Sequence, residues 1–285
     1  MEKLKGWKKL TLSQAGREIL IKAVAQAIPA YPMNLFKFPN SFCQEMDALI
    51  SKFWWGQKQG ENRIHWVSRE KLGRSKEDCG IGLRSFTLFN DALLAKQCWR
   101  LIVEPNSLWA SVLKARYFPN CSFLKAKRGG RASWIWSSLL AGREILRNGA
   151  HWQIMDDNDT RVWVDRWLTS LPLGKPLPLG PVQVSKNLKV KSLICQESRG
   201  WDIDFLKPFL VDAEFAAILG TITGDPLLKD RLIWLYEKRG SYLVKAGYYW
   251  CLTHSSGRIP PPSLATNCPR ALWKIIWKLE TPPKI

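Results

Sequence analysis

The chain has 285 residues, of which 46% are hydrophobic, and its 43 Lys and Arg residues exceed its 24 Asp and Glu residues to give a net charge of +19. This composition indicates a globular chain, and the charge favours a polyanionic partner such as nucleic acid, with an ordinary solvated basic surface as the alternative. No run of about eighteen apolar residues occurs, and the basic N-terminal segment lacks the apolar stretch of a secretory signal, so neither a transmembrane helix nor secretion is expected.

The seven cysteines are scattered through the chain and contain no Cys-x-x-Cys pair. An odd, dispersed set argues against a disulfide framework and favours a reducing, intracellular compartment. The best zinc-like grouping is Cys251, His254 and Cys268, which lacks the fourth ligand that a structural zinc site needs. We therefore expect no metal site and no cofactor.

Apolar periodicity predicts a succession of helices in the N-terminal half. Leu12, Ala15, Ile19, Ala23 and Ala27 recur at helical intervals, and a capping box from Ser41 and Gln44, a cap at Asn90, and caps at Ser107 and Ser133 would start four later helices. Residues 57–85 read as a basic loop with one short element. The expected helices cover 11–28, 42–54, 91–103, 108–117 and 133–147.

The stretch 152–164, WQIMDDNDTRVWV, predicts a β-hairpin because four turn-forming residues separate two apolar, aromatic runs. Its Ile154-Met155-Asp156-Asp157 is one residue away from the Tyr-Met-Asp-Asp signature of reverse transcriptases. A two-metal polymerase site also needs a third carboxylate on a neighbouring strand. Only helices are expected upstream, so we interpret these aspartates as the tip of a turn.

The remaining chain is expected to be divided by a proline- and glycine-rich linker at 169–187. A helical stretch at 188–220 with a cap at Asp204, a small hairpin at 231–244 and a helix at 245–252 follow. The sequence thus predicts a mainly α fold with two small β-hairpins (α+β), in four parts. These parts are a helical region ending in a hairpin (1–168), the linker (169–187), a small α+β region (188–259), and a second linker with the start of another domain (260–285).

Basic residues alternate with aromatic residues in one region. Between 57 and 131 there are 15 Lys and Arg residues against 6 Asp and Glu residues. Cations beside exposed rings suit phosphate contacts combined with base stacking, although helix C-termini favour cations in any case and a Tyr-Phe pair before proline often packs in a core. The candidate nucleic-acid-binding residues are Lys114, Arg116, Tyr117, Lys125, Lys127, Arg128 and Arg131.

Several stretches resemble a known family. LSQAGREILIKAVAQAIPAYPM, KFWWGQ, IHWVSREKL, FNDALLAKQCWRL, VLKARYFPN and VWVDRWL are similar to the region downstream of the polymerase core in plant LINE-type (non-LTR) retrotransposon reverse transcriptases. Similar open reading frames occur in plant mitochondrial genomes. DRLIWLYEKRGSYLVKAGYYW and LWKIIWKLETPPKI resemble the segment that leads into the zinc-binding reverse-transcriptase domain of these elements.

The resemblance implies that GREILIKAV belongs to thumb-like helices and that the catalytic palm precedes the chain. The zinc-binding domain and an RNase H domain would follow Ile285, so both ends look cut. The family hairpin usually reads Ile-Gly-Asp-Gly, with Met155 and Asp157 replacing the glycines here.

The implied function is a non-catalytic fragment of an RNA-directed DNA polymerase homologue that contacts RNA or DNA, with no membrane and no small-molecule substrate. The expected compartment is the nucleus or the mitochondrion. An interaction protein or pseudogene product without nucleic-acid affinity is the alternative.

Overall fold

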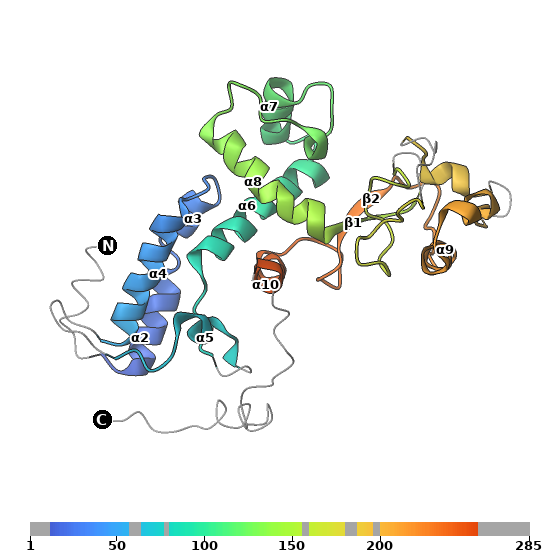
Figure 1. Cartoon of the computed structure of the whole chain (residues 1–285). Coiled ribbons are helices and arrows are strands. Elements are labelled where there is room, and N and C mark those ends of the chain that lie inside the picture. The colour runs from blue at the N-terminus through green and yellow to red at the C-terminus, as the bar shows by residue number, and fades with distance from the viewer. Residues whose placement is uncertain are drawn as a thin grey trace. The chain divides into compact units, whose positions relative to one another are not determined.

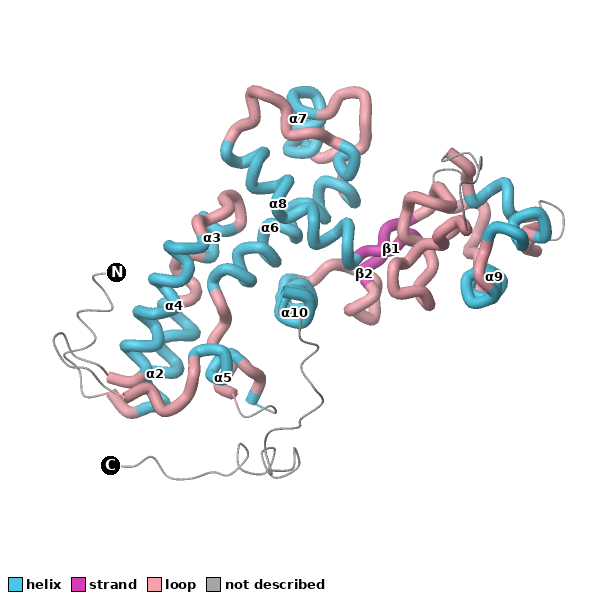
Figure 2. The backbone as a smooth tube through the Cα atoms, viewed as in Figure 1, coloured by secondary structure: helices cyan, strands magenta, loops and turns pink. Residues whose placement is uncertain are grey.

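The computed structural model describes residues 12–56, 64–76, 80–155, 160–179, 187–195 and 200–255. These residues are mainly helical and include one two-stranded antiparallel sheet (Figure 2). The predicted mainly α fold with a small β component is therefore confirmed. The chain packs as two compact units, a first unit of Met1–Ile145 with Val244–Ile285 and a second unit of Leu146–Leu243.

The first unit is built from helices (Figure 1). They are α2 (Gln14–Leu20), the π-helical η1 (Ile21–Ala25), α3 (Ala30–Met33), α4 (Asn40–Trp54), α5 (Arg69–Gly73), α6 (Phe86–Val103), α7 (Leu108–Tyr117), the 3₁₀ turn η3 (Phe123–Lys125), most of α8 (Trp134–Gly149) and α10 (Val244–Ser255). The boundary between the two units falls within α8.

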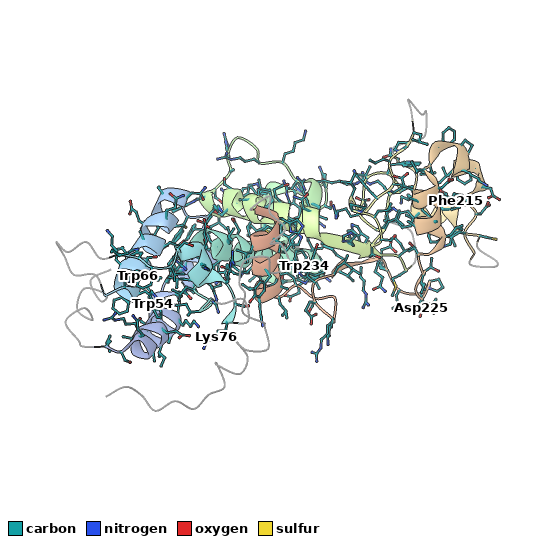
Figure 3. The ribbon with its side chains drawn as sticks, turned by 60° about the horizontal axis from the view of Figure 1, so that its bottom comes forward. Trp54, Trp66, Lys76, Phe215, Asp225 and Trp234 are labelled. Carbon is teal, nitrogen blue, oxygen red and sulfur yellow. The ribbon has the colours of Figure 1, made fainter. Side chains whose placement is uncertain are left out.

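Helix α6 is the centre of the first unit because apolar side chains cover most of its circumference and ten of its residues are buried. Helix α10, more than 140 residues further along the chain, packs against it. The backbone N–H of Ser85, just before α6, donates to the hydroxyl of Tyr248 on α10 at 3.0 Å. Trp54, at the end of α4 (Figure 3), is partly buried against the same core.

Asn90 was predicted to cap a helix. It lies instead buried inside α6. Its amide nitrogen donates to the carbonyls of Met33 and Phe36 at 2.7 and 2.9 Å, and its amide oxygen accepts from the backbone N–H of Phe38 at 2.8 Å. The side chain thereby satisfies the polar backbone between α3 and α4, which would otherwise be buried without partners.

Two further expectations for this unit are corrected. The predicted apolar face of the first helix is largely solvent-facing, since Ile19 is 65% exposed whereas its neighbour Ile21 is fully buried. Helix α4 begins at Asn40 without a side-chain cap, so Ser41 lies inside the helix and forms no capping box. By contrast, Ser107 and Ser133 accept N–H bonds from Ala110 and Trp136, as expected of N-caps.

The second unit has little regular structure. Its elements are β1 (Ala150–Gln153), η4 (Val190–Leu193), η5 (Asp204–Phe209), α9 (Asp212–Leu219) and β2 (Arg231–Trp234). In place of the long helix expected at 188–220, the described residues of this stretch form two 3₁₀ turns and one short α-helix. Pro208, inside η5, lacks the backbone donor that a continuous α-helix needs. Its core includes Trp163, Trp167 and Leu193, with Phe215 of α9 (Figure 3) packed against them.

The predicted hairpin at 152–164 is wrong, because β1 pairs with β2 and not with residues 160–164. In the register of this sheet, Ala150 lies opposite Trp234 and Gln153 opposite Arg231. Residues 160–164 bond elsewhere, since the N–H of Val162 donates to the carbonyl of Leu188 at 2.9 Å. Long-range pairing has replaced the local hairpin.

The second predicted hairpin, at 231–244, keeps only its first strand. The N–H of Trp234 donates to the carbonyl of Gly240 at 2.8 Å, and the chain reverses there, but residues 240–243 form no strand. The strand partner of 231–234 is β1, so one two-stranded sheet takes the place of two hairpins.

The described residues of the proline- and glycine-rich stretch, 169–179 and 187, lie within the second unit. The N–H of Leu168 donates to the carbonyl of Gly174 at 2.9 Å, and that of Leu177 donates to the carboxylate of Glu214 at 2.9 Å. The four-part division from the sequence is a different partition from the two compact units. The segment 260–285, with its expected domain start, lies outside the described residues.

Candidate nucleic-acid interface

The seven predicted binding residues lie in the last turn of α7 and in the connection from α7 to α8. Lys114, Arg116 and Tyr117 form the last turn of α7, and Lys125 ends η3. Lys127, Arg128 and Arg131 follow in the loop before α8. All six cations are exposed and Tyr117 is half-buried. We call these seven residues the basic cluster.

The surroundings of the basic cluster lack nearby acids along the chain. Residues 105–143 contain seven Lys and Arg residues and no Asp or Glu. Within the described ranges, none of the six exposed cations forms an ion pair with a carboxylate. Since the charges are uncompensated and lie within a few residues of one another, their fields add at this surface.

An aromatic platform fixes the position of Tyr117. Its ring stacks on Trp136 of α8 with the centroids 4.6 Å apart and the planes 4° apart. Phe118 also stacks on Trp136 at 5.6 Å, and Phe123 meets it edge-on at 5.9 Å. The Tyr117 hydroxyl donates to Oγ of Ser133 at 2.9 Å. The ring is thus held in place before any ligand arrives.

A buried arginine holds the loop that carries the lysines. Arg143 of α8 is 7% exposed, and its guanidinium donates to the carbonyls of Phe123 and Ala126 at 3.1 and 2.6 Å. Lys125 and Lys127 flank Ala126, so these two bonds fix the backbone on both sides of Lys125. Charge-assisted bonds of this kind are stronger than neutral ones.

A hollow of about 450 Å³ opens between the end of α7 and the loop. We call it the Tyr117 hollow. Its lining combines the platform ring with the lysines of the cluster. The lining residues are Tyr117, Phe118, Pro119, Asn120, Cys121, Lys125, Lys127 and Gly129.

The structure therefore brings Tyr117, Lys125 and Lys127 of the predicted set together around one hollow, with the other four cations on adjoining backbone. Sequence reasoning missed the residues that organise this surface, namely Trp136, Phe123 and Arg143. Two signals could have found them, the absence of acids over 105–143 and the Gly142-Arg143 pair inside a helix. The alternative reading of Tyr117-Phe118 is correct for Phe118, which is a core residue with 6% exposure.

The other sites considered from the sequence can be placed only in part. Asp156–Asp159 and Cys268 lie outside the described residues. The carboxylate of Asp230 accepts from the N–H of Met155 at 2.8 Å and from the hydroxyl of Thr160 at 2.6 Å. Cys251 is buried, which raises its pKa to about 12, and Nδ1 of His254 lies 2.8 Å from the carbonyl of Trp250.

Two further structural findings concern the described part of the chain alone. Among these residues, no group of three or more His, Cys, Asp and Glu side chains is placed to hold a metal ion. No helix within the described ranges is long and apolar enough to cross a membrane.

Fold and surface together define a mainly helical protein with an exposed basic cluster around a fixed aromatic ring. No family model matches the chain. An uncharacterized mitochondrial protein of Arabidopsis thaliana, AtMg00310, is 40% identical over 153 residues, which is 53% of this chain and 97% of that protein. The chain belongs to the family of this mitochondrial protein, and its predicted similarity to plant open reading frames is confirmed at that level.

A second relative covers nearly the whole chain. The Arabidopsis thaliana protein named "Putative ribonuclease H protein At1g65750" is 30% identical over an alignment of 294 residues. This alignment includes 99% of the present chain and 45% of the relative, so the chain spans less than half of that protein's length.

Proposed function

We propose that this chain is a non-catalytic segment of a retrotransposon reverse transcriptase of the LINE type, and that it binds RNA or DNA through the basic cluster. The observation that carries the binding proposal is the set of six exposed cations on an acid-free stretch around a fixed ring. The retroelement origin is supported by the resemblance of the sequence motifs and by the longer relative named for ribonuclease H.

The binding proposal is tested by the salt dependence of affinity. Each phosphate neutralised by Lys or Arg contributes about −0.7 to −0.9 to the slope of log K against log salt. Anisotropy titrations with a short labelled RNA should give a steep negative slope for the wild-type chain. The variant Lys125→Gln/Lys127→Gln/Arg128→Gln/Arg131→Gln should flatten that slope by up to about 3 and weaken binding more than tenfold at moderate salt.

A matched variant controls for net charge. Lys207, Lys229, Lys238 and Arg239 are exposed residues of the second unit. Changing these four to Gln removes the same charge and should leave most of the slope. A wild-type slope near zero, or equal losses in the two variants, would contradict binding through the basic cluster. The first result would favour the alternative, a structural or interaction protein without nucleic-acid affinity.

We further propose that this chain has no polymerase or ribonuclease activity of its own, because the family's palm and RNase H motifs do not occur in its sequence. Metal-dependent extension of a primer on an RNA template by the purified chain would overturn this proposal. The mitochondrial name of the related protein supports a mitochondrial location over a nuclear one. A fluorescent fusion of the full chain in plant cells distinguishes the two compartments.

A further inference from the structure

We infer that the Tyr117 hollow takes one unpaired nucleotide, so that the chain prefers single-stranded nucleic acid to duplex. This inference rests on the proposed function and adds the class of ligand that the cluster selects. The hollow of about 450 Å³ lies within the range of about 300–1,000 Å³ that is typical of small-ligand sites.

The stacking surface for a base is already in place. Tyr117 lines the hollow, and Trp136 and Ser133 fix its ring plane and its hydroxyl. A base that stacks there loses little protein entropy, since the ring does not need to be ordered first. The exposed guanidinium of Arg116 lies over the same ring, 5.5 Å from its centroid, so an incoming base stacks on this flat cation or displaces it from the ring.

The phosphate contacts come from the same lining. Lys125 and Lys127 border the hollow, and the bonds from Arg143 to the carbonyls of Phe123 and Ala126 hold the backbone on both sides of Lys125. The amide of Asn120, also in the lining, offers a donor and an acceptor to a base edge. The hollow therefore combines a flat ring, cations and an amide, which are the groups that recognise an unstacked nucleotide.

Duplex nucleic acid does not present such a nucleotide. Each paired base is stacked on both sides, and its extrusion into a pocket costs a few kcal/mol. The exposed cations Arg128 and Arg131 can contact the backbone of either form. Single strands should therefore gain the stacking contribution, whereas duplexes gain only the electrostatic one.

The experiment compares affinities of the full chain for a single-stranded RNA and for its duplex, at one fixed salt concentration. We expect the wild type to bind the single strand about tenfold more tightly, which corresponds to one stacked base. Tyr117→Leu and the hollow-filling Cys121→Trp should each lower the single-strand affinity to that for the duplex and so abolish this preference. Tyr31→Leu, at an exposed tyrosine outside the hollow, should retain the preference.

A second readout follows the base itself. A single-stranded RNA that carries 2-aminopurine should show a fluorescence change on binding the wild type, which is lost in Cys121→Trp, a variant that keeps Tyr117 in place. Equal wild-type affinity for single strand and duplex, with a steep salt slope, overturns this inference and leaves the proposed function standing. Absence of salt-dependent binding to either form overturns both.

Discussion

The hexapeptide Ala-Gly-Arg-Glu-Ile-Leu occurs twice in this chain, at 15–20 and at 141–146. Both copies are helical, but the first runs from the second residue of α2, whose cap is Ser13, to the end of that helix, whereas the second lies in the interior of α8. The same six side chains therefore have the same local conformation in two different surroundings. Their burial differs at nearly every position.

The glycine and the isoleucine show the difference most directly. A Cβ on Gly16 would meet its nearest atom at 3.5 Å, in ordinary contact, while one on Gly142 would lie 2.7 Å from Cβ of Leu94 and 2.8 Å from the Leu94 carbonyl carbon. Gly142 thus permits the close approach of α8 to α6. Ile19 is 65% exposed, and Ile145 is 7% exposed.

The arginine has a related role in both copies. Arg17 donates to the carbonyl of Trp54 at 3.2 Å from a half-buried position, while the buried Arg143 donates to two carbonyls of the loop that carries Lys125 and Lys127. In each case an arginine satisfies backbone acceptors of a distant segment. The second copy places this contact behind the exposed cations of the basic cluster, which links it to the proposed function.

The largest expected effect comes from the isoleucine pair. Ile145→Ala should lower the free energy of unfolding by about 3 kcal/mol, because it removes buried apolar atoms and leaves a cavity. Ile19→Ala should change it by less than about 0.5 kcal/mol. Urea denaturation followed by circular dichroism measures both, and similar losses would show that the two copies share one environment.

Arg143→Met should lower the free energy of unfolding by about 2–3 kcal/mol, since two carbonyls lose a charged donor. It should also weaken RNA binding severalfold, because Lys125 and Lys127 lose their support. Arg17→Met should lower the free energy of unfolding by less than Arg143→Met does and should leave the RNA affinity unchanged. Urea denaturation and anisotropy titrations measure the two effects for both variants. An unaltered RNA affinity in Arg143→Met would show that the bonds from Arg143 to the loop are not needed for RNA binding.

Substituting the two glycines by alanine should change the stability of the chain in opposite directions. Gly142→Ala should destabilise the chain by about 2 kcal/mol, because the added methyl group forces α8 away from α6. Gly16→Ala should stabilise it by up to about 1 kcal/mol, since alanine is the better helix former. Thermal unfolding of the two single variants decides this, and a stable Gly142→Ala protein would mean that the helices can separate without loss.

The glutamates should show the smallest effect. Glu18 lies 2.6 Å from the ammonium of Lys22 and 3.5 Å from that of Lys76, whereas the carboxylate of Glu144 lies 3.7 Å from Nε of Arg143. Glu18→Gln should cost about 0.5 kcal/mol at low salt and less at high salt. Glu144→Gln should cost less than Glu18→Gln, because Glu144 is more exposed. A salt-independent loss for Glu18→Gln would show that its ion pairs contribute nothing.

Much of the helical framework could be predicted from the sequence, since Ser107 and Ser133 cap their helices as expected and proline or glycine ends several others. The predictions failed where long-range contacts replaced local ones. Asn90 has the residue type of a helix cap, but its side chain bonds the backbone between α3 and α4. The stretch 152–164 has the pattern of a hairpin, but its first residues belong to β1, which pairs with β2 about 80 positions further along the chain.

The candidate site could likewise be predicted from the sequence only in part. The cations and Tyr117 are visible in the sequence as a basic, aromatic stretch. The hollow is not, because it depends on Trp136 and Arg143 reaching back from α8 to the end of α7 and its loop.

The sequence by itself determined the charge of this protein, its helices and the identity of its exposed cations, because composition and local propensity act over a few residues. The two copies of the hexapeptide show which properties local sequence does not determine. Both are helical, since helix formation is local, but only tertiary packing decided that one isoleucine is exposed and the other buried. Packing likewise turned one of two identical arginines into the anchor of the basic cluster, since burial depends on neighbours that are distant in the chain.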